Sequence, residues 1–136
     1  MNRMTPRRDL FRMMAAALVP ASGKIPNAVL DAGQAKLQRE PFGDLRVYFD
    51  GPTDQLKAMT AGSLELKPGM TPHAPHQHPE EEIMLITSGE GEITLDGKIL
   101  RVGPGSMMYC AAGRTHGVVN TGKTPMTFFY YKWIVG

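Results

Sequence analysis

The chain contains a single cysteine, Cys110, among its 136 residues. One thiol excludes an intrachain disulfide framework, and it excludes a zinc or iron–sulfur site built from several thiolates of one chain. Any metal site must therefore use histidine and carboxylate ligands. Cys110 itself is expected to be a small buried apolar side chain rather than a nucleophile.

An excess of positive charge is missing from most of the chain, although the formal net charge is +2. The first 23 residues hold four arginines and one aspartate, whereas residues 24–136 hold 11 basic and 12 acidic side chains. The larger part is thus close to neutral and lacks the basic stripe that binds phosphates. We therefore expect no nucleic-acid partner.

The apolar part of the N-terminal segment is too short to form a permanent membrane anchor. Its uncharged run, 13–23, spans at most about 17 Å as a helix, about half of the hydrocarbon thickness. The basic residues that precede it include Arg7 and Arg8. The segment 1–23 resembles a cleavable signal peptide of the twin-arginine (Tat) type, which implies the Tat export machinery as a partner and a periplasmic or secreted protein. The alternative is an amphipathic N-terminal helix of a cytoplasmic protein.

The rest of the chain has the pattern of an all-β protein. Its 15 glycines and 11 prolines exceed the average share of these residues, which is roughly 12%, and they separate short runs rich in β-branched and aromatic residues. The predicted strands are 45–49, 56–66, 82–87, 92–95, 98–102, 106–110, 116–120 and 124–135. This spacing favours an antiparallel sandwich or barrel over 43–136. The segment 24–42 is expected to be a linker, or to contain a short helix around 28–38.

Two of the predicted strands are apolar on both faces. These are 83–86 and 126–133, where a half-solvated strand would alternate apolar and polar residues. One face must fill the interior, and the other must be covered by another layer or by a second subunit. We therefore expect a homodimer; the alternative is that the N-terminal strands provide all of the cover.

Three histidines and one glutamate form the most informative set: His76, His78, Glu82 and His116. In a strand, His76 and His78 would point to the same face about 6.6 Å apart, so both imidazoles could reach one ion. Glu82 shares their parity, but a straight strand would place it about 13 Å from His78. The chain must therefore bend at 79–81, and we expect the histidine pair to end one strand and Glu82 to open the next.

A fourth ligand must come from another part of the chain. His116 opens a predicted strand after the turn at 111–115, and a closed barrel could bring that strand alongside the first pair. The other interpretation is chance, with a few surface histidines and a solvated acidic run. Glu80 and Glu81 are expected to be solvated turn charges, and His73 is expected to be a loop histidine or a residue at the mouth of the site.

These residues match two spaced signatures. The first, H-x-H, three residues, E, six residues, G, is met by His76, His78, Glu82 and Gly89. The second, G, five residues, P-x-G-x-x-H, three residues, N, is met by Gly105, Gly113, His116 and Asn120. The sequence thus resembles a small single-domain cupin over 45–135, although Ala111 replaces the usual proline and Gly69 lies one residue farther from His76 than usual. The resemblance implies a double-stranded β-helix, or jelly-roll barrel, around a divalent metal.

Three imidazoles and one carboxylate leave coordination positions open, as in catalytic rather than sealed structural sites. Such a set suits Fe(II), Mn(II), Ni(II), Cu(II) or Zn(II). Fe(II) or Mn(II) is favoured here because a protein folded before export is loaded with metal in the cytoplasm.

The leading hypothesis for function is a small metalloenzyme acting on a small oxygen-rich molecule. By resemblance its reaction is that of a dioxygenase, a decarboxylase or an isomerase. The alternatives are a cupin that binds a ligand or a metal without turnover, and a metal-free scaffold. The sequence shows no clear acid–base pair. The candidates for proton transfer or substrate orientation are Tyr48, Tyr109, Tyr130 and Arg114.

Overall fold

The computed structural model describes residues 23–136. The predicted signal peptide lies outside these residues except for its last position, Gly23. Among the described residues, no helix is long and apolar enough to cross a membrane. The elements are β1 (Lys36–Glu40), β2 (Gly43–Gly51), β3 (Leu56–Leu66), β4 (Glu81–Ser88), β5 (Gly91–Leu95), β6 (Lys98–Val102), β7 (Met107–Cys110), β8 (His116–Val119) and β9 (Met126–Val135).

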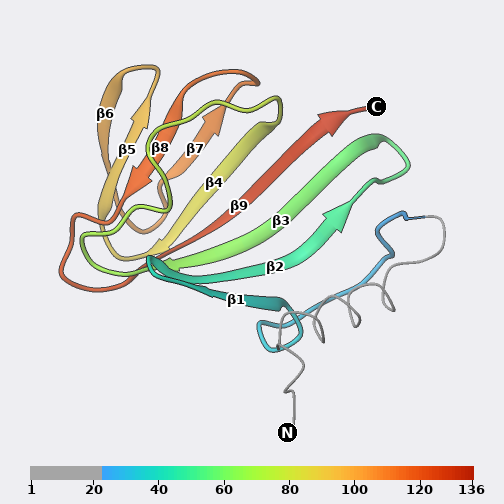
Figure 1. Cartoon of the computed structure of the whole chain (residues 1–136), viewed down its shortest axis with the longest axis horizontal. Helices are drawn as coiled ribbons and strands as arrows, with labels where there is room; N and C mark the ends of the chain where they lie inside the picture. The colour runs from blue at the N-terminus through green and yellow to red at the C-terminus, as the bar shows by residue number, and fades with distance from the viewer. Residues whose placement is uncertain (1–22) are drawn as a thin grey trace, which may run out of the picture.

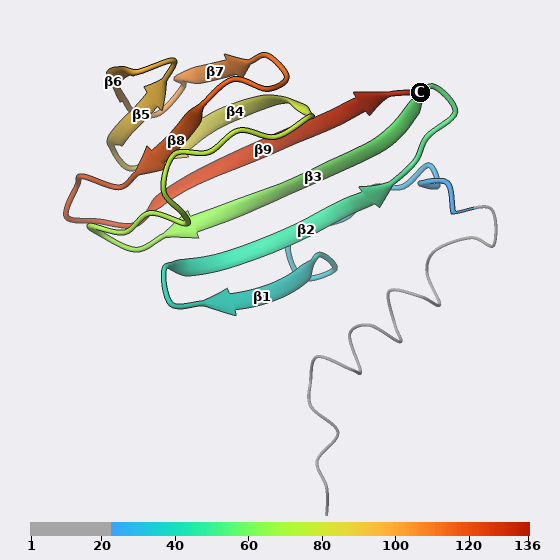
Figure 2. The ribbon, with the colours of Figure 1, turned by 45° about the horizontal axis from the view of Figure 1, so that its top comes forward.

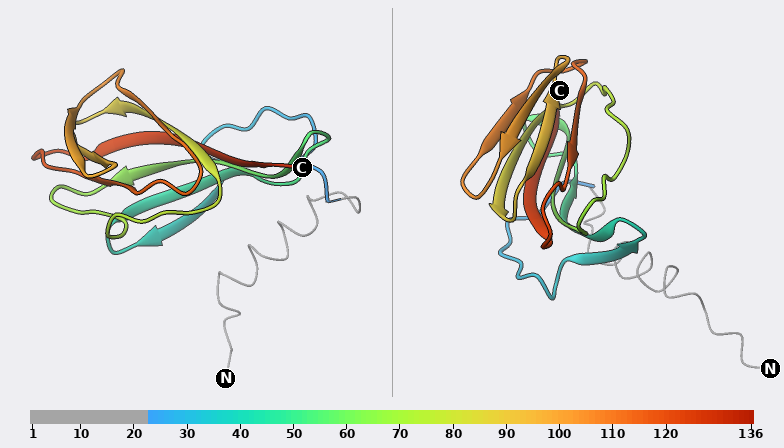
Figure 3. Two further views of the ribbon diagram at one scale, coloured as in Figure 1. Left: turned by 90° about the horizontal axis from the view of Figure 1, so that it is seen from above. Right: turned by 90° about the vertical axis from the view of Figure 1, so that its left-hand side faces the viewer.

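The strands form two antiparallel sheets. The larger sheet has the order β1-β2-β3-β9-β4-β7, and the smaller has the order β6-β5-β8. The smaller sheet covers the end of the larger sheet that contains β4 and β7, while β1 and β2 extend away from it (Figures 1 and 2). Figure 3 shows the two layers from above and from the side. The prediction of an all-β jelly roll is confirmed.

The strand β1 lies in the segment 24–42, which we expected to be a linker or a short helix. Its residues are mostly polar and show no apolar alternation, so the sequence pattern did not indicate a strand. Its backbone pairs with β2 from Lys36 opposite Val47 to Glu40 opposite Gly43. The turn requires a glycine at position 43, because a Cβ there would lie 2.0 Å from the backbone oxygen of Glu65. The hairpin, rather than side-chain patterning, makes this segment a strand.

The core lies between the two sheets. On β4 the buried side chains alternate, and Glu82, Met84 and Ile86 face the interior. The adjacent β9 contributes Met126 and Phe128 to the same space. The other buried members are Leu64, Leu66, Ile93, Met108, Cys110 and Val118. Glu82 is thus a charged residue at an interior position of a core strand.

The opposite face of the larger sheet is also rich in apolar and aromatic side chains. Strand register places Ile83 beside Tyr109 and Tyr131, and Leu85 beside Met107 and Phe129. Directly paired residues of neighbouring strands share one face of a sheet. This outer face therefore explains why 83–86 is apolar at every position and why 126–133 is apolar at every position except Thr127 and Lys132.

Candidate metal centre

The four predicted ligands come from three parts of the chain. His76 and His78 lie in the loop between β3 and β4, Glu82 lies on β4, and His116 is the first residue of β8. Our expectation that the histidine pair ends a strand is wrong, because His76 forms only an isolated bridge with His116. Prolines at 72, 75 and 79 lack the N–H group that a continuing strand ladder needs.

Backbone hydrogen bonds hold the loop against the start of β8. The N–H of His76 donates to the oxygen of His116 at 2.9 Å, and the N–H of His116 donates back to His76 at 2.9 Å. The N–H of Gly113 donates to the oxygen of His78 at 2.9 Å. The loop therefore has a defined position, and its two imidazoles are directed by main-chain contacts.

The three imidazoles converge. One ring nitrogen from each of His76, His78 and His116 lies within 4.8 Å of the others. The ring centroids are 5.1 Å apart for His76 and His78, 5.0 Å for His76 and His116, and 4.7 Å for His78 and His116, with near-perpendicular planes. Rings that meet edge to face leave space between their nitrogen atoms, as three ligands of one ion require.

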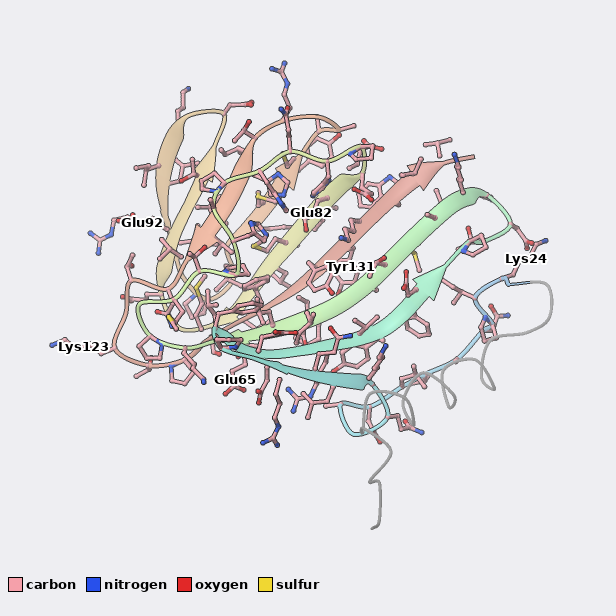
Figure 4. The ribbon with its side chains drawn as sticks, viewed as in Figure 1. Lys24, Glu65, Glu82, Glu92, Lys123 and Tyr131 are labelled. Atoms are coloured by element: carbon pink, nitrogen blue, oxygen red, sulfur yellow. The ribbon has the colours of Figure 1, made fainter. Side chains whose placement is uncertain are left out.

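Glu82 completes the set from the opposite sheet. Its Oε2 atom lies 2.5 Å from Nε2 of His116 and 3.5 Å from Nε2 of His78. Oε2 is buried and has no hydrogen-bond partner of good geometry. A buried carboxylate oxygen without a donor is costly unless a cation satisfies it. Figure 4 shows Glu82 on β4, near the loop that carries the histidine pair.

The outer nitrogen atoms of two rings are hydrogen-bonded away from the centre. Nδ1 of His116 lies 3.2 Å from the backbone oxygen of Arg114, and Nδ1 of His78 lies 3.1 Å from the backbone oxygen of Glu80. A carbonyl oxygen only accepts, so each Nδ1 carries the proton and each neutral ring directs the lone pair of Nε2 inward. Two lone pairs and one carboxylate oxygen then face one another, an arrangement that fits a shared cation.

The pKa values follow from the same contacts. Burial and the neighbouring His73 lower the pKa of His76 to about 4. Contact with Glu82 raises the pKa of His116 above its ordinary value. Burial acts to raise the pKa of Glu82, but the contact with His116 and the charge of His78 together lower it. A proton on Nε2 of His116 and a metal ion would therefore compete for the same place beside Glu82.

The ligand set opens into a pocket of about 260 Å³. Its walls are mostly apolar, and its polar members besides the four candidate ligands include His73, Tyr130 and Lys132. The ring of His73 stacks on His76 with centroids 3.7 Å apart. Of our two expectations for His73, the one that places it at the mouth of the site agrees with this position.

Only one of the four candidates for proton transfer or substrate orientation lines this pocket. Tyr130 does so, and burial raises its pKa to about 12. Tyr109 is exposed and donates to Oε1 of Glu81 at 2.7 Å, while Tyr48 packs against Phe129 with ring centroids 6.2 Å apart. Arg114 is exposed and contributes only its backbone oxygen to the site. These three lie outside the pocket lining because of strand parity and loop position.

Other residues have roles that the sequence did not indicate. Glu80 is not a free turn charge, because its Oε2 atom lies 3.0 Å from Nδ1 of His78. Glu81 is also paired, since it accepts hydrogen bonds from Tyr109 and from Nε1 of Trp133. Cys110 is buried as expected, but its Sγ atom lies 3.4 Å from Nδ1 of His116. The pair of His78 and Glu80 lies within one loop, whereas the contacts of Glu81 and Cys110 join residues of different strands and have no local sequence signal.

Comparison with known proteins identifies the family. The family model described as Cupin domain matches residues 62–132, which is more than half of the chain. The chain is a cupin. It is similar to mannose-1-phosphate guanylyltransferase of Escherichia coli (strain K12), with 29% identity over 86 residues, or 63% of this chain. This cupin spans only 17% of the length of that relative.

Solved structures show the same fold. An RmlC-like cupin from Shewanella frigidimarina matches with a TM-score of 0.66 and 16% identity, covering 79% of this chain and 91% of the other. KdgF from Halomonas sp. matches with a TM-score of 0.65 and 19% identity, covering 79% of this chain and 94% of the other. At these identities the likeness concerns the fold alone. The cupin fold and the cluster of three histidines indicate a divalent metal site.

Proposed function

We propose that this cupin holds one divalent metal ion through His76, His78, Glu82 and His116, and acts on a small oxygen-rich molecule in the adjoining pocket. The observation that carries the proposal is the buried Oε2 atom of Glu82, which has no donor and faces two imidazole nitrogens. Fe(II) or Mn(II) is the favoured ion, with Ni(II), Cu(II) and Zn(II) as the other ions that this donor set suits. When bound, the ion would supply Lewis acidity to an oxygen group of the ligand.

The chain's own residues supply the rest of the site. Glu80 and the backbone oxygen of Arg114 fix the ring orientation of His78 and His116. The apolar walls exclude water around the ligand, and Tyr130 keeps its proton at neutral pH and can donate a hydrogen bond. These features support a metalloenzyme of the dioxygenase, decarboxylase or isomerase type.

The second candidate is a cupin that binds a small ligand without turnover. It is favoured by the pocket chemistry, because Tyr130 is too weak an acid to exchange its proton readily and, apart from the four candidate ligands, no paired acid and base line the described pocket. Both candidates need the same ligand set. They differ only in whether the bound molecule is converted.

Elemental analysis of the full chain, purified without added metal, tests the metal centre. We expect about one divalent ion per chain in the wild type and almost none in His116→Ala. Circular dichroism and thermal unfolding establish whether the variant is folded. A folded His116→Ala variant with wild-type metal content would show that the ligand assignment is wrong.

Oxygen-uptake and product assays with catechols, diketones, thiols and oxalate-like acids then separate the two candidates. Turnover by the wild type that is absent from His116→Ala supports the enzyme. Saturable binding of a compound with no conversion supports the binding module.

We further propose that the precursor is exported by the Tat machinery and acts in the periplasm or outside the cell. The proposal rests on Arg7 and Arg8 before the uncharged run 13–23. Changing both arginines to lysine should leave precursor in the cytoplasm, as fractionation and immunoblotting would show. Unchanged secretion of the double variant would refute this route.

A further inference from the structure

Lys132 lines the metal pocket, although no sequence signature includes it. It lies on β9 directly opposite Glu82 of β4, on the same face as Phe128 and Tyr130. Its side chain is half-buried. Within residues 23–136, Lys132 makes no ion pair within 4.0 Å and no side-chain hydrogen bond. A cationic group thus faces the pocket without a direct partner.

The charges around the pocket are unequal once the centre holds a metal. Among the lining residues, Glu82 is the acidic side chain and Lys132 is the lysine, while the three ligand histidines must be neutral to coordinate. A divalent ion brings two positive charges, Glu82 cancels one, and Lys132 adds one. The loaded pocket therefore has a net charge of about +2. Such a charge in a largely apolar space favours an anion.

The alternative role for Lys132 is to balance the charge of Glu82. Opposite charges on paired strand positions are common, but here the two groups do not reach ion-pair distance. A carboxylate that coordinates a cation also loses most of its attraction for a second positive charge. The balancing role would thus disappear when the metal binds, which leaves Lys132 available to a ligand.

The other residues that line the pocket indicate the chemistry of the rest of the ligand. Leu45, Leu64, Met84 and Phe128 line the pocket and offer only apolar contact. The volume of about 260 Å³ lies below the usual range for drug-sized ligands. The ligand should therefore be a small molecule with an apolar body and at least one charged oxygen group.

We propose that Lys132 binds an anionic oxygen group of the ligand, so that the pocket selects small carboxylates or similar oxyanions with an apolar body over neutral analogues. This proposal rests on the proposed function in that the ligand shares the pocket with the metal. Lys132 is a specificity-determining residue in this scheme, and it is not a ligand of the ion.

Matched probe pairs test the proposal in the metal-loaded full chain. Benzoate and benzamide have nearly the same shape and differ in charge, as do butyrate and butyramide. Isothermal titration calorimetry at one pH and ionic strength gives the Kd of each. We expect the wild type to bind at least one carboxylate about tenfold more tightly than its amide, the difference that a charge-assisted contact can supply.

Three variants give the controls. Lys132→Met keeps the length of the side chain and should lose most of the preference for the carboxylate, whereas Lys132→Arg should retain it. Lys98→Met removes an exposed lysine of β6 and should behave as the wild type. Metal content should be equal in all variants, and thermal unfolding should show that each is folded.

The outcomes distinguish this proposal from the metal function. Equal metal content with an unchanged carboxylate preference in Lys132→Met would overturn the role of Lys132 and leave the metal centre intact. No measurable carboxylate binding by the wild type up to about 10 mM would also overturn it. If elemental analysis finds that the wild type takes up no metal, the metal function is refuted. A carboxylate preference of that protein that depends on Lys132 would still support the present inference.

Discussion

Nε2 of His116 and Oε2 of Glu82 lie 2.5 Å apart although they belong to strands of different sheets. His116 begins β8 in the smaller sheet, and Glu82 lies on β4 in the larger sheet. Both side chains are buried, with 2% and 7% of their residue surfaces exposed. The candidate metal centre therefore lies between the two layers of the barrel and takes residues from both.

Removing the charge of Glu82 should weaken metal binding. In Glu82→Gln the shape of the side chain is kept while an anionic ligand atom is lost, so we expect the metal Kd to rise by about 100-fold or more. Competition with a chromophoric chelator would measure it. Glu81→Gln is the matched control, because Glu81 faces the other side of β4 and its amide oxygen keeps one of the two acceptor positions used by Tyr109 and Trp133. Equal metal affinity in the two variants would contradict the role of Glu82.

Metal affinity should increase with pH across the range in which His116 loses its proton. The contact with Glu82 raises the pKa of His116 above 6.5, so a proton competes with the metal below that raised value. His76 competes little near neutrality because its pKa is about 4. Calorimetry in buffers of different ionisation enthalpy should show release of about one proton near pH 6.5. An affinity that is constant from about pH 6 to pH 8 would contradict this assignment.

The folding stability of the metal-free protein should decrease as pH rises above neutrality, whereas the metal affinity should increase. The pKa of His116 is raised, so its pairing with Glu82 stabilises the fold below the ordinary histidine value of 6.5 and is lost as pH rises through the raised value. The pKa of Glu82 is lowered, so its contribution is present above 4.5 and is lost as pH falls. Urea unfolding of the metal-free protein should therefore give the largest contribution of the His116–Glu82 pair to the free energy of unfolding between about pH 4.5 and pH 6.5.

Asn120 should contribute to stability rather than to metal binding. Its fully buried side chain donates to the oxygens of Leu66 and Thr124 and accepts from the N–H of Gly122. Asn120→Ala leaves these groups unpaired, so we expect a loss of about 2–4 kcal/mol in the free energy of unfolding. Urea unfolding would measure it. Asn27→Ala, at an exposed position, should change stability by less than about 0.5 kcal/mol.

We propose that the outer face of the larger sheet is covered by a second copy of the chain. Met107, Tyr109 and Tyr131 are 65%, 54% and 41% exposed on this face. In the part of the face around these residues, the acidic group Glu81 is already bonded to Tyr109 and Trp133. Asp44 and Glu65 lie farther along the same face, on β2 and β3. Exposed apolar patches of this kind mark interaction surfaces.

Light scattering with size-exclusion chromatography would measure this association. The wild type should be a dimer, and Tyr131→Glu should shift it towards monomer because a charge would be buried in the interface. Leu100→Glu changes an exposed apolar residue of β6 in the other sheet and should leave the dimer intact. A monomeric wild type at working concentration would remove the proposal.

The sequence alone indicated the strands of the barrel and the spacing of His76, His78, Glu82 and His116. Strand alternation and turn residues are local properties, so they can be read from neighbouring positions. The strand β1 could not be predicted in this way, because it is held by backbone pairing with β2 and its mostly polar side chains show no apolar alternation.

Only the tertiary structure decided which further residues meet the site. Lys132 faces the pocket because β9 returns from the end of the chain to lie beside β4, 50 residues away in register with Glu82. The same long-range pairing placed Tyr109 on the outer face, although its neighbour Cys110 touches His116. Side-chain direction reverses at each position of a strand, so a single step in register decides between pocket and surface, and that register is set by contacts across the whole barrel.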